Sequence, residues 1–196
     1  MEFLVAYAST DGMTAEIAQR IGQRLREADH NVEISEIAQL PRDFDIARFD
    51  AVLIGASVHA HGYQHRVRRF VVPRLPALRA KPTAFFSVCM AIASKDPGER
   101  AEAEEIPERW AERLGWAPQA IEVIAGAVRF TRYGFLRKAV MLAIARREMT
   151  GPVDPTRDYI LTDWQQVDAF ANTFAELAQA RVARMRGVLP VAPPPG

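Results

Sequence analysis

Short apolar runs alternate along most of the chain with segments in which apolar residues recur at helical spacing. One run, residues 32–37, alternates apolar with mostly acidic residues, as an edge strand with one solvated face does. Four others have the length and content of buried strands, namely residues 2–8 (EFLVAYA), 51–56 (AVLIGA), 83–88 (TAFFSV) and 120–128 (AIEVIAGAV). These five runs predict the strands of a sheet.

Segments with helical spacing follow the predicted strands. After the first strand, Ile17, Ile21 and Leu25 fall on one face of a predicted helix. A second helix is predicted after residue 63, with Pro73 and Pro76 expected to fray its end, and a polar third helix over residues 99–114. Because buried strands alternate with helices, the sequence predicts an α/β fold in which a parallel sheet is covered on both faces.

The last predicted helix has the clearest signals. Thr162 and Gln165 are expected to form a capping box at its start. One apolar stripe follows, comprising Trp164, Val167, Ala171, Phe174 and Ala178. After Arg181 the chain becomes basic and then proline-rich, so we expect one domain over residues 1–180 and a disordered tail over residues 181–196.

Residues 129–159 form a longer connection between the last strand and the last helix than a sheet of this kind needs, which predicts an insertion. Its centre, residues 134–149, is expected to be helical, and residues 139–145 (AVMLAIA) are apolar on every face of that helix. The segment could hold a ligand or lie on an anionic membrane; alternatively, it packs on the domain or a second subunit with its charges solvated. Between positions 129 and 150 a single acidic residue, Glu148, accompanies six basic ones, Arg129, Arg132, Arg137, Lys138, Arg146 and Arg147.

Composition excludes several classes of protein. The 196 residues suffice for one domain with a full core, and 25 Lys and Arg against 24 Asp and Glu give no overall sign of nucleic-acid binding. The single cysteine, Cys89, cannot form an internal disulfide, and no secretory signal or membrane-spanning run is present, so a cytoplasmic location is expected. No metal site is expected, because no cluster of His or acidic residues has ligand spacing near Cys89.

Three predicted loops, residues 9–14, 57–63 and 89–96, follow parallel strands at their carboxyl ends, where sheets of this class bind ligands. The first loop places three hydroxyl groups and a glycine before a helix, an arrangement that favours phosphate binding. Its sequence matches neither the Walker loop nor the Gly-x-Gly-x-x-Gly motif. The alternative is that the same residue types only cap the helix.

The loop STDGMT at residues 9–14 is similar to the flavodoxin pattern Thr/Ser-x-Thr-Gly-x-Thr, whose loop holds the phosphate of FMN. Over residues 2–177 the chain resembles one branch, the bacterial quinone-dependent protoporphyrinogen IX dehydrogenases, most clearly at residues 54–58 (IGASV), 84–88 (AFFSV), 123–130 (VIAGAVRF), 132–133 (RY) and 159–167 (YILTDWQQV). The resemblance implies a flavodoxin-like doubly wound parallel sheet of five strands in the order 2-1-3-4-5, with a helical insertion after strand five.

The resemblance also implies a function in haem biosynthesis, the oxidation of protoporphyrinogen IX by FMN with menaquinone or ubiquinone as acceptor. Such an enzyme would be peripheral on the inner face of the cell membrane. The residues implied to bind FMN are Ser9, Thr10, Asp11, Gly12, Met13, Thr14, Ser57, Val58, His59, Ser87, Val88, Cys89 and Met90. Contacts with substrate or membrane would come from His61, Tyr63, Arg129, Arg132, Tyr133, Arg137 and Lys138.

Within this scheme, the Asp11 carboxylate is expected to cap a backbone N–H group, because it would repel a phosphate. No catalytic acid or base is assigned, because the redox chemistry belongs to the flavin. His59 and His61 could instead be solvated loop residues, and Cys89 is expected to be a small packed thiol rather than a nucleophile.

Other functions stay open at this point, namely a flavodoxin-type electron carrier, an NAD(P)H:quinone reductase and a flavin-free interaction module. Electron-carrying flavodoxins are typically acidic and sandwich the flavin between aromatic rings. This chain is nearly neutral and has no Trp in either flavin loop, which favours an enzyme over a carrier. An oligomer is compatible with the sequence.

Overall fold

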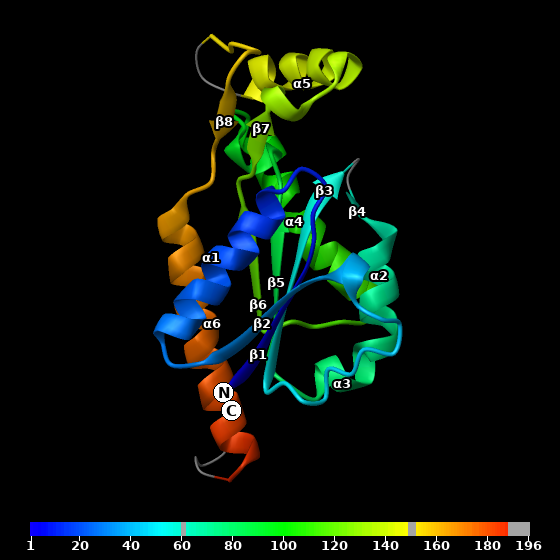
Figure 1. The fold of residues 1–196 in the computed structure, drawn as a ribbon, viewed down its shortest axis with the longest axis vertical. Helices are drawn as coiled ribbons and strands as arrows, with labels where there is room; N and C mark the ends of the chain where they lie inside the picture. The colour runs from blue at the N-terminus through cyan, green and yellow to red at the C-terminus, as the bar shows by residue number, and fades with distance from the viewer. Residues whose placement is uncertain (60–61, 149–151, 188–196) are drawn as a thin grey trace.

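The computed structural model describes residues 1–59, 62–148 and 152–187, organised around a parallel sheet (Figure 1). Within these residues, five parallel strands lie in the order β2-β1-β3-β5-β6, and the short strand β4 pairs antiparallel with the end of β3. If only the parallel strands are counted, this is the expected order 2-1-3-4-5, so the predicted topology is confirmed. The strands are β1 (Glu2–Ala8), β2 (Asn31–Glu36), β3 (Ala51–His59), β4 (Gly62–Tyr63), β5 (Thr83–Val88) and β6 (Ala120–Ile124).

Helices cover both faces of the sheet, as predicted (Figure 1). Phe85 and Phe86 belong to the cores on opposite faces, because successive side chains of a strand alternate in direction. The predicted stripe of Ile17, Ile21 and Leu25 is buried on the Phe86 side. On that side lie α1 (Met13–Glu27) and α6 (Trp164–Met185); on the other lie α2 (His65–Val71), α3 (Leu75–Arg79) and α4 (Pro97–Leu114).

The capping box predicted for the last helix is wrong. The N-cap of α6 is Asp163, whose carboxylate accepts hydrogen bonds from the backbone N–H groups of Gln165 at 2.8 Å and Gln166 at 3.3 Å. The hydroxyl of Thr162 instead donates to the carbonyl oxygen of Ala125 at 2.7 Å. Thr162 therefore joins the start of the helix to the end of β6, and Asp163 instead of Thr162 caps the helix.

The prolines after α2 do not fray a helix but divide it. Pro73 lies in a 3₁₀ turn, Val72–Arg74, and Pro76 lies near the start of α3. Proline fits the first turn of a helix because the N–H group that it lacks would have no intrahelical partner there. Val67, Phe70 and Val71 are buried as expected.

The strand predicted over residues 120–128 is interrupted. After β6 the chain leaves the sheet, and β7 (Ala127–Arg129) pairs antiparallel with β8 (Asp158–Ile160). The interruption includes Gly126, where a Cβ atom would lie 3.1 Å from Cγ1 of Val88. The two strands form the stem of the predicted insertion, which lies beyond the carboxyl ends of the parallel strands (Figure 1).

The insertion contains the helix that the sequence predicts. α5 spans Phe135–Glu148, against an expected 134–149 in which Met149 lies outside the described residues. A small separate core fixes α5 to its stem, with Met141 and Leu142 packing partly buried against it. That core comprises Val128, Phe130, Tyr133, Ala145 and Val153.

The last helix extends beyond residue 180, where the domain was expected to end. α6 continues to Met185, so the first residues of the predicted tail are helical, while residues 188–196 lie outside the described part. Among the described helices, none has both the length and the apolar character needed to span a bilayer.

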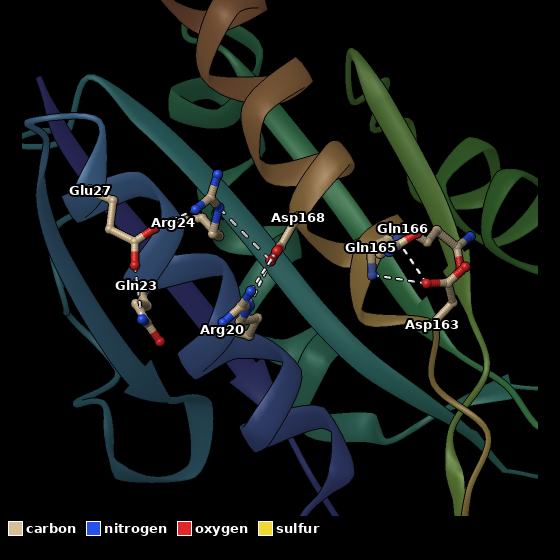
Figure 2. A network of polar contacts seen from close by, with 8 residues as sticks. All are labelled: Arg20, Gln23, Arg24, Glu27, Asp163, Gln165, Gln166 and Asp168. Carbon is tan, nitrogen blue, oxygen red and sulfur yellow. Dashed lines mark hydrogen bonds and ion pairs between the residues drawn. The ribbon is translucent and has the colours of Figure 1, made fainter.

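An ion pair joins the two helices on the first face (Figure 2). Arg20 of α1 donates to both carboxylate oxygens of Asp168 of α6, at 2.6 and 2.5 Å. This guanidinium lowers the pKa of the Asp168 carboxyl below its ordinary value of 3.8. A lowered pKa means that the pair stabilises the fold above the ordinary value and loses this effect as the pH falls through the lowered one.

We therefore expect Asp168→Asn to reduce the free energy of unfolding at neutral pH, with a difference from the wild type that shrinks as the medium is acidified. Urea unfolding at several pH values measures this. Glu105→Gln is the control, because the pair of Glu105 with Arg109 is exposed on a single helix and worth little. A loss that is independent of pH would show that Asp168 acts by packing alone.

Candidate functional site

A cavity of about 390 Å³ opens where the carboxyl ends of the parallel strands meet the insertion. Its size is ordinary for a ligand pocket. All three loops predicted to converge contribute to it, and so do α4 and the insertion. The lining residues are Asp11, Met13, Thr14, Ser57, Val58, His59, Val88, Cys89, Met90, Ala91, Ile106, Gly126, Ala127, Tyr133, Met141 and Ile144.

The 9–14 loop turns tightly into α1. Gly12 is the N-cap residue and has a φ of 91°, a left-handed conformation that side chains rarely adopt. Its N–H group donates to Oγ of Ser9 at 2.9 Å, which closes the loop. Since Gly12 has no side chain with which to cap the helix, the loop presents the N-terminus of α1 to a ligand.

Gln64 connects the first two loops. Its Nε2 donates to Oγ1 of Thr10 at 3.1 Å and to Oγ of Ser57 at 2.9 Å. Oγ of Ser57 also lies 3.0 Å from Nε2 of His59. The predicted phosphate loop and the predicted flavin loop are therefore held together by one amide side chain.

The third loop contributes Cys89 and Met90, which follow Val88 at the end of β5. The backbone N–H of Cys89 donates to the carbonyl oxygen of Ile124 at 3.0 Å, so the loop continues the pairing of β5 with β6. Val88 and Cys89 are buried and border the cavity. The thiol thus has the packed environment that the sequence predicts.

Two predicted contacts point away from the cavity. Ser87 is fully buried and accepts a hydrogen bond from the hydroxyl of Tyr63 at 2.7 Å. The Tyr63 ring lies 5.0 Å from the rings of both Phe85 and Trp110, in the core on the opposite face, and burial raises the pKa of its hydroxyl. Because Ser87 alternates with Val88 along β5, its side chain does not line the cavity, and neither does that of Tyr63. The structure thus gives no support to the predicted contacts of Ser87 with the flavin and of Tyr63 with the substrate, which stay predictions.

The insertion places Tyr133 at the cavity, as the expected substrate contact requires, but turns Arg129 away from the surface. Arg129 is buried, and its Nη2 donates to Oε2 of Glu16 at 2.6 Å and lies 3.6 Å from Sδ of Met13. The hydroxyl of Tyr133 accepts from the backbone N–H of Arg129 at 3.2 Å. The β7–β8 stem turns the side chain of Arg129 onto α1, which gives no support to the predicted contact with headgroups or propionates, and that contact stays a prediction.

The remaining predicted contacts differ in exposure. Arg132 is exposed, and its Nη1 lies 3.5 Å from the carbonyl oxygen of Asp11. Lys138 is partly exposed in the first turn of α5. His61 lies outside the described residues, and the side chain of Arg137 is likewise outside the description.

Sequence reasoning missed several residues of the site. Ile106 reaches the cavity from α4, and no local pattern distinguishes it from the other apolar residues of that helix. Gln64 has no motif either, although it follows a predicted flavin loop. Met141 and Ile144 belong to the apolar run of the insertion, but only the fold shows that they face the cavity.

The fold and the site together define a flavodoxin-like protein. A model of the flavodoxin domain matches residues 4–155, so the chain belongs to the flavodoxin domain family. Membership in this family indicates FMN as the cofactor. The structure of oxidised Flavodoxin 1 from Bacillus cereus has the same fold, with a TM-score of 0.56, 17% identity, and coverage of 90% of this chain and 98% of that one.

Two relatives are similar over most of their length. Protoporphyrinogen IX dehydrogenase (quinone) from Escherichia coli K12 is 28% identical over 177 residues, which cover 90% of this chain and 96% of that protein. The Leishmania major protein of the same name is 29% identical over 179 residues, which cover 90% of this chain and 76% of that protein. Both names are those of oxidoreductases.

The residues present fit FMN. Ser9, Thr10 and Thr14 bring hydroxyl groups to the start of α1, and Gly12 allows the backbone of the loop to approach a phosphate closely. Val58, Val88 and Met90 give the adjoining cavity the apolar walls that a flavin ring needs. The phosphate end would be held by the loop and the ring by the cavity.

Proposed function

We propose that this protein is an FMN-dependent enzyme that oxidises protoporphyrinogen IX to protoporphyrin IX and passes the electrons to a membrane quinone. The observation that carries the proposal is the wall that the insertion adds to the cavity, where Tyr133, Met141 and Ile144 border the same space as the FMN loops. A large apolar macrocycle needs such a wall, whereas a carrier of single electrons does not. The names of the two relatives support this substrate and this acceptor.

When bound, FMN supplies the redox chemistry by accepting the electrons taken from the porphyrinogen. The chain supplies placement and a dry environment. Val58, Val88 and Met90 line the cavity with apolar surface that would exclude water once a flavin is bound, and the Ser57–His59 pair offers polar groups at one side of it. Tyr133, held by its hydrogen bond to the backbone of Arg129, gives the substrate a fixed aromatic wall.

The exposed apolar residues of α5 support contact with the membrane that contains the quinone. Phe135 is 87% exposed and Val140 59%, although both are apolar. Lys138 and Arg146 lie on the same helix. Apolar side chains beside basic ones suit a helix that lies in the headgroup region of an anionic bilayer. The enzyme would then act as a peripheral protein on the cytoplasmic face.

The proposal is tested with FMN-loaded protein, protoporphyrinogen IX and a soluble menaquinone analogue under anaerobic conditions, with porphyrin fluorescence as the readout. Fluorescence that grows only when protein and quinone are both present is the expected result. Reduction of the bound flavin by NADPH alone, with no porphyrin formed, would instead identify an NAD(P)H:quinone reductase. A protein that holds FMN and catalyses neither reaction would be an electron carrier.

The membrane contact gives a separate prediction. Phe135→Ser combined with Val140→Ser is expected to lower turnover with quinone in anionic vesicles about tenfold or more, because burial of one large apolar side chain is worth about 1.5–3 kcal/mol. Turnover with a soluble quinone should not change. Val72→Ser is the control, since Val72 is also exposed and apolar but lies outside the insertion. Equal losses with both quinones would place the effect on the cavity instead.

A further inference from the structure

Two arginines of the insertion lie at the 9–14 loop rather than at the surface of the insertion. Nη1 of Arg132 is 3.5 Å from the carbonyl oxygen of Asp11 and 3.1 Å from the point where a Cβ on Gly12 would stand. Nη1 of Arg129 is 4.0 Å from the same point. The two guanidinium groups therefore converge on the glycine that begins α1.

Arg129 is buried to an unusual degree for a permanent charge. Its side chain is 7% exposed, whereas that of its ion-pair partner Glu16 is 45% exposed. Nε of Arg129 is buried without a hydrogen-bond partner among the described residues. Because a buried donor without a partner is costly, this guanidinium has the environment of a group that completes its contacts with an anionic ligand.

The loop beside these arginines lacks a cation of its own. Residues 9–14 contain no Lys or Arg, and the nearest acidic residues, Asp11 and Glu16, oppose an anion. A phosphate monoester carries close to two negative charges at neutral pH. Backbone N–H groups at a helix N-terminus and hydroxyls can hold such a group, and a guanidinium fork adds a full opposite charge in a geometry that matches phosphate oxygens well. Arg66 of α2 also reaches this loop, where its Nη2 donates to the carbonyl oxygen of Ser9 at 2.7 Å.

We propose that Arg129 and Arg132 bind the phosphate of FMN and thereby tie the insertion to the cofactor. The proposal rests on FMN as the cofactor and is independent of the substrate. One consequence is selectivity for FMN over riboflavin, which has the same ring but no phosphate. The other is that FMN binding stabilises the β7–β8 stem and α5, because the ligand favours the conformation that it binds.

The test is a titration of apoprotein with FMN and with riboflavin, followed by quenching of flavin fluorescence. Arg129→Gln and Arg132→Gln are each expected to raise the Kd for FMN about tenfold to a hundredfold, the range for loss of a charged hydrogen bond, with the Kd for riboflavin within about twofold of the wild type. Arg146→Gln is the matched control, an exposed arginine of the same insertion, and should bind both flavins normally. Hydrogen exchange in α5 should slow when FMN, but not riboflavin, is added.

Equal weakening of FMN and riboflavin binding would overturn the proposal, because Arg129 would then only dock the insertion on Glu16. An unchanged Kd for FMN in both variants would overturn it as well. Arg132 is exposed, so Arg132→Gln keeps the test valid if Arg129→Gln does not fold. Since neither porphyrinogen nor quinone is present, failure here would leave the proposed dehydrogenase activity untouched.

Discussion

Replacing Gly55 with alanine is expected to lower the free energy of unfolding by about 3 kcal/mol, a large effect for one added methyl group. A Cβ atom at Gly55 would lie 1.9 Å from Cζ of Phe86 and within 2.4 Å of two further atoms of that ring. Phe86 is fully buried between the sheet and the helices α1 and α6. The ring would have to move, and the side chains packed around it would have to move with it.

Urea unfolding of the apoprotein measures this effect. Gly134→Ala is the control, because nothing lies within 4 Å of a Cβ at that position. A second substitution, Phe86→Leu, removes the colliding ring atoms, so the double variant should lose less stability than the sum of the two single losses. Strict additivity would show that Gly55→Ala acts by some route other than this collision.

Replacing Gly12 with valine is expected to raise the Kd for FMN about a hundredfold or more, since a strained backbone costs about 1–3 kcal/mol and misaligned donors add to that. The φ of 91° at Gly12 is one that a β-branched residue does not adopt, so the loop must change conformation. The start of α1 and the hydroxyl groups of the loop then lose their common orientation.

Flavin fluorescence titration and circular dichroism, taken together, check this second prediction. The variant should keep its secondary structure while it loses FMN, because Gly12 lies in the loop between β1 and α1 and not within either element. Gly134→Val is the control for a bulky residue at a position with open space. Normal FMN affinity in Gly12→Val would show that the loop does not hold the phosphate.

The topology could be predicted because it depends on patterns that are continuous in the sequence. The buried strands and the apolar stripes of α1 and α6 are such patterns, and the structure reproduces them. The break after β6 could not be predicted, since residues 120–128 form one apolar run and β7 leaves the sheet only to pair with β8, far along the chain. The prediction of the α6 cap was wrong for a similar reason, because the hydroxyl of Thr162 donates to the carbonyl oxygen of Ala125, which lies far from it in the sequence.

The parts of the candidate site that come directly after the parallel strands could be predicted from the sequence. The loop of residues 9–14 combines local signals of strand, glycine and helix, and the structure places it beside the cavity. The direction of the Ser87 side chain could not be predicted, because the sequence alone does not show which face of β5 borders the cavity. The burial of Arg129 could not be predicted, because it depends on Glu16, 113 residues away in the chain.

The proposed function requires that protoporphyrinogen IX transfers electrons directly to the bound FMN. The most direct measurement mixes FMN-loaded protein with protoporphyrinogen IX anaerobically and without quinone, while the visible absorbance of the flavin and the fluorescence of the porphyrin are followed together. Loss of flavin absorbance at the same rate as porphyrin appears, and its return when a menaquinone analogue is added, is the predicted result. A flavin that stays oxidised while the porphyrinogen persists would contradict the account.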